Sequence, residues 1–117
     1  MSSKTKKVVQ LAAIGLMALL FLITSAAKLS GAATENFHHW GYNEPFMYAV
    51  GVVELICAIA LMIKNIRRFA IGILILLMIG AAFTHLRSHE PWMLLVNAAV
   101  IAILLLIAWL EPHPREV

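Results

Sequence analysis

Four long apolar runs constrain this chain more than any other feature of its sequence. They occupy residues 8–27, 46–63, 69–84 and 91–110, and Glu54 is the one charged residue inside them. A bilayer core of about 30 Å is crossed by roughly 20 helical residues, and backbone groups in lipid must bond within their own segment. We therefore expect transmembrane helices at about residues 8–29, 46–63, 67–86 and 91–110, packed as an antiparallel all-α four-helix bundle.

The composition agrees with this interpretation. Of the 117 residues, 62% are hydrophobic and only 13% are charged, whereas a soluble domain is charged at about a quarter of its positions. The chain lacks the polar residues needed to coat a water-soluble globule, which excludes most soluble enzymes and also excludes disorder. At this length we expect one domain, residues 1–117.

The distribution of basic residues predicts the direction of the helices. With the N-terminus inside, seven basic residues face the cytoplasm and only Lys28 and Arg87 face outward; the seven are Lys4, Lys6, Lys7, Lys64, Arg67, Arg68 and Arg115. Cytoplasmic loops carry an excess of Lys and Arg, so we expect both termini in the cytoplasm. The same dispersion argues against a nucleic-acid partner, because no basic stripe with interleaved aromatic residues is present.

A cleaved signal peptide is the competing interpretation of the first run. Three lysines precede the apolar residues 11–23, and Ser25, Ala26 and Ala27 follow them. This order also occurs in secretory signals, and cleavage there would leave three helices. The run is long for a signal core, so we favour a retained first helix.

The first link and the C-terminal tail have different patterns. Residues 31–45 place Thr34 as a helix N-cap, Phe37 and Trp40 on one helical side, and Gly41 as a stop signal. We expect a short interfacial helix at the outer surface. The tail, residues 111–117, contains two prolines and is expected to be frayed.

The expected topology gathers polar side chains in one layer. Glu54 lies about 12 Å below the outer end of its helix and Asn97 about 9 Å below the start of its own, at a rise of 1.5 Å per residue. Lys28, one turn beyond Thr24, and His85 lie at the outer ends of the first and third helices. Charges inside membrane helices are candidates for function. We therefore predict a polar pocket in the outer half of the bundle.

A purely structural explanation of these residues stays open. Lys28 could extend to the lipid headgroups, Glu54 could pair with Lys28, and Asn97 could form an ordinary interhelical hydrogen bond. For Glu54 a functional role is favoured, because a charge at the centre of a membrane helix costs about 2.5–3.5 kcal/mol on insertion scales.

A metal or haem site is a more specific alternative, but fewer sequence features support it. His85 and His89 are four residues apart, and His38 and His39 are expected on the same side of the membrane. Pro91 interrupts the helix nearby, and no CxxCH motif is present for covalent haem. The single Cys57 can form neither a disulfide nor a CxxC pair within the chain. We therefore expect no metal.

Two further patterns have structural interpretations. Gly72, Gly80 and Thr84 follow one side of the third helix and predict a close-packing ridge. Lys64, Arg67 and Arg68 form a cytoplasmic anchor that favours anionic lipid.

Three stretches resemble the DoxX-like membrane proteins. They are FLITSAAKLSG at residues 21–31, VGVVELICAIALMI at 50–63 and RRFAIGILILLMIGAAFTHL at 67–86. The resemblance implies a small four-helix protein of the bacterial inner membrane, with Lys28, Glu54 and His85 at the recurrent polar positions of the family. Better-known relatives include a subunit of a thiosulfate:quinone oxidoreductase and proteins of oxidative-stress or quinone-stress systems. The chain lacks the cysteines of a self-contained sulfur-oxidising enzyme, so catalysis stays undecided.

Three functions are compatible with these observations. The favoured one is an accessory component of a membrane redox or stress-response system that contacts quinone in the predicted pocket and works beside other membrane subunits. The second is a transporter or binder of a small lipophilic molecule, which would require a second half or a homo-oligomer. The third is a non-catalytic scaffold whose polar layer only fixes the helix register.

Overall fold

The computed structural model describes residues 2–111, and these residues form five helices. They are α1 (Ser3–Leu29), α2 (Thr34–His39), α3 (Glu44–Leu61), α4 (Arg67–Arg87) and α5 (Pro91–Leu110). The all-α prediction is confirmed: the described residues contain no strand, and α1, α3, α4 and α5 are long and apolar enough to cross a membrane. The first helix begins five residues earlier than expected, and Arg115 lies outside the described residues.

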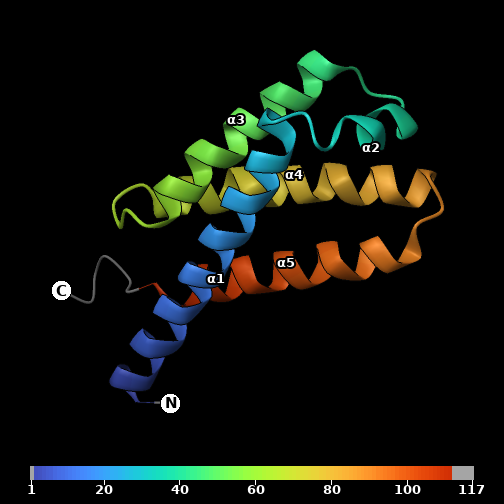
Figure 1. The fold of residues 1–117 in the computed structure, drawn as a ribbon. Helices are drawn as coiled ribbons and strands as arrows, with labels where there is room; N and C mark the ends of the chain where they lie inside the picture. Colours follow the sequence, from blue (N-terminus) through green and yellow to red (C-terminus); the bar gives the residue numbers. More distant parts are fainter. Residues whose placement is uncertain (1, 112–117) are drawn as a thin grey trace.

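The four long helices form an antiparallel bundle in which α1 and α4 each pack against α3 and α5. Figure 1 shows that the start of α1, the α3–α4 link and the end of α5 lie at one end of the bundle. We call this the N-terminal end. The short helix α2 and the α4–α5 link lie at the opposite end, which we call the α2 end.

The bundle carries apolar side chains on its outside as well as in its core. The core is built from buried residues of all four long helices, with Phe21, Leu74, Leu104 and Ile107 almost fully covered. Large apolar side chains also point outward from every long helix, for example Leu19, Ile56, Phe83 and Leu95. Such an exterior is suited to lipid rather than to water.

The approach of α1 to α3 is made close by Gly51. A Cβ atom at this position would lie 3.0 Å from Cβ of Lys28 and 3.1 Å from Cγ of Leu29, so the absence of a side chain lets the two helices meet. The ridge predicted on α4 is wrong. A Cβ added at Gly72 or Gly80 would meet no atom within 4 Å, so neither glycine lies at a close contact between helices.

The short helix expected in the first link is present as α2, and two glycines bound its segment. Gly31 and Gly41 have φ angles of +86° and +90°, values that glycine adopts without steric cost. Gly41 ends the segment as expected. Thr34 is not the N-cap: Ala33 has that position, and the Thr34 hydroxyl donates to the carbonyl of Gly31 at 2.7 Å.

A buried polar cluster closes the N-terminal end. Arg67 donates through Nε to the carbonyl of Leu61 at 2.6 Å and forms an ion pair with Glu111. Gln10 donates to the same carboxylate oxygen of Glu111 at 2.6 Å and to the carbonyl of Ile107 at 3.3 Å. Two predictions need correction: Glu111 is held by α1 and α4 instead of being frayed, and Arg67 is buried in this cluster instead of anchoring to lipid.

Candidate functional site: a cavity at the α2 end

A cavity of about 430 Å³ lies at the α2 end, between the four long helices and α2. Its walls are largely apolar, with side chains such as Phe21, Val50, Leu77 and Val100. A few polar side chains enter it, and these include Thr24, Lys28, Glu54, Thr84, His85 and Asn97. An apolar cavity of this size with a few convergent polar groups has the character of a small-molecule site.

The charged part of the cavity is the pair formed by Lys28 and Glu54. Nζ of Lys28 lies 2.8 Å from Oε1 of Glu54, and the Glu54 side chain is only 3% exposed. The ammonium also donates to the carbonyl of Thr24 at 3.4 Å. The pair is held mainly by charge, because Oε1 has no well-aligned hydrogen bond. A buried pair with an unfilled hydrogen-bonding site does not recover its full desolvation cost.

Asn97 is the least satisfied polar residue of the cavity. Its side chain is 4% exposed, and its Nδ2 has no hydrogen-bond partner. A buried donor without a partner costs about 1–3 kcal/mol, so the amide in this position lowers the stability of the ligand-free protein. Because Asn97 lines the cavity, an acceptor atom of a bound molecule could complete its bonding.

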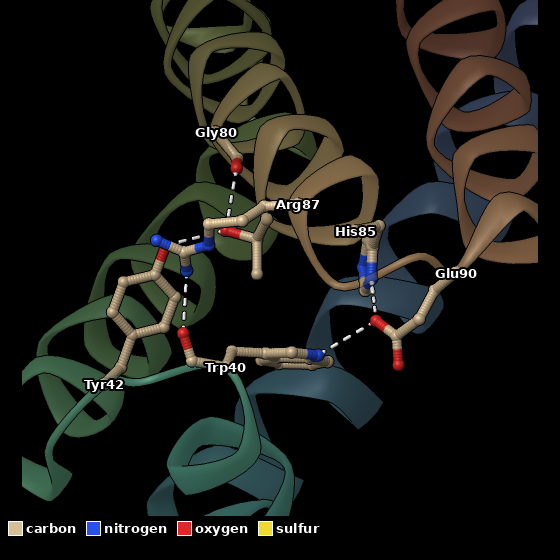
Figure 2. A network of polar contacts seen from close by, with 7 residues as sticks. Trp40, Tyr42, Gly80, His85, Arg87 and Glu90 are labelled. Carbon is tan, nitrogen blue, oxygen red and sulfur yellow. Dashed lines mark hydrogen bonds and ion pairs between the residues drawn. The ribbon is translucent and has the colours of Figure 1, made fainter.

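His85 links the cavity to the surface of the α2 end. Its Nδ1 lies 2.8 Å from Oε1 of Glu90, and Nε1 of Trp40 donates to the same oxygen at 2.9 Å (Figure 2). The Trp40 ring stands edge-on to the imidazole at a centroid distance of 5.2 Å. The hydrogen bond with His85 is the main reason that the pKa of Glu90 lies below its usual value, and the bond from Trp40 adds to the effect.

Three aromatic residues of the α1–α3 link cover the cavity, and we call Phe37, Trp40 and Tyr42 the aromatic lid. The Phe37 ring lies 5.3 Å from that of Trp40 and 6.1 Å from that of Tyr42, measured between centroids. Its ring centroid also lies 6.0 Å from Nζ of Lys28. The lid therefore contacts the charged pair directly.

Side chains of α4 hold the lid in place. The Tyr42 hydroxyl lies 2.7 Å from Oγ1 of Thr84, which donates to the carbonyl of Gly80 at 3.0 Å. Arg87 donates to the carbonyl of Trp40 at 2.7 Å, and its guanidinium lies over the Tyr42 ring (Figure 2). The lid is thus bonded to α4 at two points besides the Trp40–Glu90 bond.

The histidines do not assemble a metal centre within the described residues, where no three His, Cys, Asp or Glu side chains are placed to hold an ion. His85 uses Nδ1 for Glu90, and His89 lies beyond the helix with a φ of +58°. His38 is exposed beside Glu44, with 3.9 Å between the nearest nitrogen and oxygen.

The five residues predicted to share a pocket, Thr24, Lys28, Glu54, His85 and Asn97, all line this cavity. Six other participants were not predicted as site residues: Phe37, Trp40, Tyr42, Thr84, Arg87 and Glu90. Trp40 was assigned to one side of the short helix, but its contact with Glu90 joins residues 50 positions apart. No local spacing encodes such a contact. The aromatic content of residues 31–45 was the one available signal.

Comparison with known proteins identifies one family. The family model described as the DoxX-like family matches residues 12–108, a range that contains every cavity residue named above. No curated protein and no solved structure matches the chain.

Proposed function

The chain belongs to the DoxX-like family, and we propose that its cavity binds the headgroup of a quinone-like lipophilic molecule. In this proposal the protein is an accessory component of a membrane redox or stress-response system. The observation that carries the proposal is the buried and unpartnered Nδ2 of Asn97 in a cavity whose walls are largely apolar. Such a donor is complementary to a carbonyl oxygen on an apolar ring.

The other polar groups extend this complementarity. Lys28 has three N–H donors, and it contacts Glu54 and the carbonyl of Thr24. A second carbonyl oxygen of the ligand could accept a hydrogen bond from this ammonium. The aromatic lid and the apolar walls would then cover the ring faces.

Proton exchange with the bound ring is the task we assign to His85. A quinone gains protons when it is reduced and loses them when it is oxidised, and an imidazole is suited to such transfer near neutral pH. His85 lines the cavity and contacts Glu90, whose side chain is 30% exposed. The pair therefore offers a short route between the ligand and the aqueous surface.

We further propose that the N-terminal end faces the cytoplasm of a bacterial cell. Lys28 and Arg67 are held in buried ion pairs and are set aside. Among the described residues this leaves Arg87 at the α2 end against five cations at the N-terminal end, namely Lys4, Lys6, Lys7, Lys64 and Arg68. With Cys57 replaced by Ala, single cysteines introduced at Ser3 or at Ser88 test the orientation through labelling with an impermeant maleimide. Labelling of Ser3→Cys in intact cells would reverse the proposed orientation.

Ligand binding can be followed through Trp40. Replacing Trp92 and Trp109 by Phe leaves Trp40 as the single tryptophan, because the sequence contains three. Titration of this protein with a short-chain benzoquinone and a short-chain naphthoquinone should quench Trp40 fluorescence in a saturable way. Mass spectrometry of lipophiles that purify with the wild-type protein would then identify the natural ligand class.

Two neighbouring substitutions separate specific binding from partitioning into the detergent. Asn97→Leu removes the unpartnered donor and should abolish saturable quenching, whereas Ala98→Leu changes an exposed neighbour and should preserve it. Equal quenching of both variants would contradict the proposal. Absence of binding by the unsubstituted cavity would favour the scaffold function instead.

A further inference from the structure

A second hollow, separate from the cavity of the proposed function, lies at the N-terminal end. It has a volume of about 910 Å³ and is bounded by the start of α1, the α3–α4 link and the end of α5. These three segments lie on the same side of the molecule in Figure 1. We call this hollow the basic groove, after the four exposed cations that line it: Lys6, Lys7, Lys64 and Arg68.

The charge of the basic groove is not neutralised within the described part of the chain. None of its four exposed cations is paired there with a carboxylate. Glu111 also borders the groove, but Arg67 and Gln10 already bond to its carboxylate. Four cations from the start of α1, the α3–α4 link and the start of α4 surround one hollow and produce a local field that attracts an anion.

The groove also has an apolar wall. Leu11 and Trp109 line it and are strongly exposed, Trp109 to 71%. Tryptophan is enriched at the level of the lipid headgroups, and Leu11 lies one turn deeper along α1 than Lys7. An occupant with an anionic head and an apolar tail would contact both parts of the groove, whereas a free anion would contact only the cations.

From this geometry we propose that the basic groove binds the phosphodiester headgroup of an anionic glycerophospholipid, with an acyl chain along Leu11 and Trp109. Basic recesses between transmembrane helices on the cytoplasmic side are suited to such headgroups. The cations and the apolar wall of the groove together determine the ligand class. Zwitterionic lipids lack the net negative charge that the cations attract, and inorganic phosphate lacks an acyl chain to contact the wall.

Native mass spectrometry of the purified full-length protein tests the proposal. The probes are phosphatidylglycerol, cardiolipin and phosphatidylcholine added in known amounts. We expect the two anionic lipids to remain bound after removal of detergent and phosphatidylcholine to be lost. Each cation removed should weaken binding about five-fold, because a basic residue near an anionic surface contributes about 1 kcal/mol.

The chain provides a matched control. Lys7→Gln and Lys4→Gln each remove one lysine from the start of α1, but only Lys7 lines the groove. Lys7→Gln and Lys64→Gln should weaken anionic-lipid binding, whereas Lys4→Gln should leave it within two-fold of the wild-type value. Equal effects of Lys4→Gln and Lys7→Gln, or equal retention of phosphatidylcholine, would overturn the proposal.

Inorganic phosphate distinguishes the two sources of the phosphate group. If millimolar phosphate displaces the lipid from the groove, a free anion is the better ligand and the lipid assignment is wrong. If the lipid stays bound, the apolar wall contributes as proposed. Quinone titration of the same Lys7→Gln protein should be unchanged, so a failure of this proposal is separable from a failure of the cavity proposal.

Discussion

The two ends of the bundle both bury charged residues, but they bond them differently. At the N-terminal end Gln10, Arg67 and Glu111 bond to one another and to two backbone carbonyls. At the α2 end the Lys28–Glu54 pair borders a cavity, and Nδ2 of Asn97 has no partner. Buried polar groups in proteins are normally hydrogen-bonded. The satisfied cluster therefore has the properties of a structural clamp, and the unsatisfied one those of a binding site.

The largest expected effect is on the clamp. Arg67→Met leaves Glu111 without its cationic partner and should lower the free energy of unfolding by about 3 kcal/mol, as removal of one member of a buried ion pair does. Unfolding in mixed micelles, followed by circular dichroism, measures the change. The double variant Arg67→Met/Glu111→Leu should recover most of the loss. A loss below about 1 kcal/mol for the single variant would remove the distinction between the two ends.

The second prediction concerns the approach of α1 to α3 beside the charged pair. Gly51→Ala adds a Cβ atom 3.0 Å from that of Lys28, and the overpacking should exceed the gain in helix propensity and destabilise the protein by about 1 kcal/mol. Gly72→Ala is the matched control, because its Cβ meets nothing within 4 Å.

The control should raise the free energy of unfolding by up to about 1 kcal/mol. Opposite signs in the two alanine variants, measured by the same micellar unfolding, would support the close approach at Gly51. Equal stabilisation of both variants would contradict it.

The third prediction tests the difference between the two ends through the sign of a change in stability. Asn97→Leu replaces a buried, unpartnered amide with an apolar side chain of similar size, so it should stabilise the ligand-free protein by about 1 kcal/mol. The same substitution should abolish quinone binding. Thermal unfolding of delipidated protein measures the first effect. Destabilisation in that assay would indicate that the amide is bonded structurally.

The smallest effect is a local pH dependence of the aromatic lid. The pKa of Glu90 is lower in the folded protein than its ordinary value of 4.5, so its bonds stabilise the folded state above that pH and are lost as the pH falls through the lower folded value. Trp40 fluorescence in the single-tryptophan protein should therefore change on acidification below pH 4.5.

Substitution of the carboxylate provides the control for that measurement. Glu90→Gln should show the acid-state fluorescence already at neutral pH, and the acid transition should disappear. A transition that persists in Glu90→Gln would assign it to another group.

The helices could be predicted from the sequence almost completely, because lipid requires long apolar segments with internally bonded backbones. The side of each helix that packs against the other helices could not be predicted as well. The lipid-exposed side of each helix is as apolar as the buried side, so the spacing of Gly72 and Gly80 carried no information about which side packs. For the same reason the bond between Gln10 and Glu111, 101 residues apart, left no local pattern.

The site residues could be predicted where a polar side chain interrupts an apolar helix, because its position along the helix gives its depth in the membrane. Glu54 and Asn97 are conspicuous because polar residues are costly in a membrane helix, and the short links determine which helix ends lie together. The lid residues Trp40 and Tyr42 gave no such signal, because aromatic side chains are ordinary at a membrane interface. Their roles depend on partners in α4 and in the α4–α5 link.

Oε1 of Glu90 is hydrogen-bonded both to Nε1 of Trp40 and to Nδ1 of His85, and this carboxylate favours one tautomer of His85. An ionised carboxylate can only accept hydrogen bonds, so the proton between Glu90 and His85 belongs to Nδ1. A neutral His85 then keeps its lone pair on Nε2, which makes that atom an acceptor. In the proposed binding mode, Asn97 supplies a donor and a neutral His85 an acceptor, so the cavity would distinguish a ligand's carbonyl from its hydroxyl and orient the two.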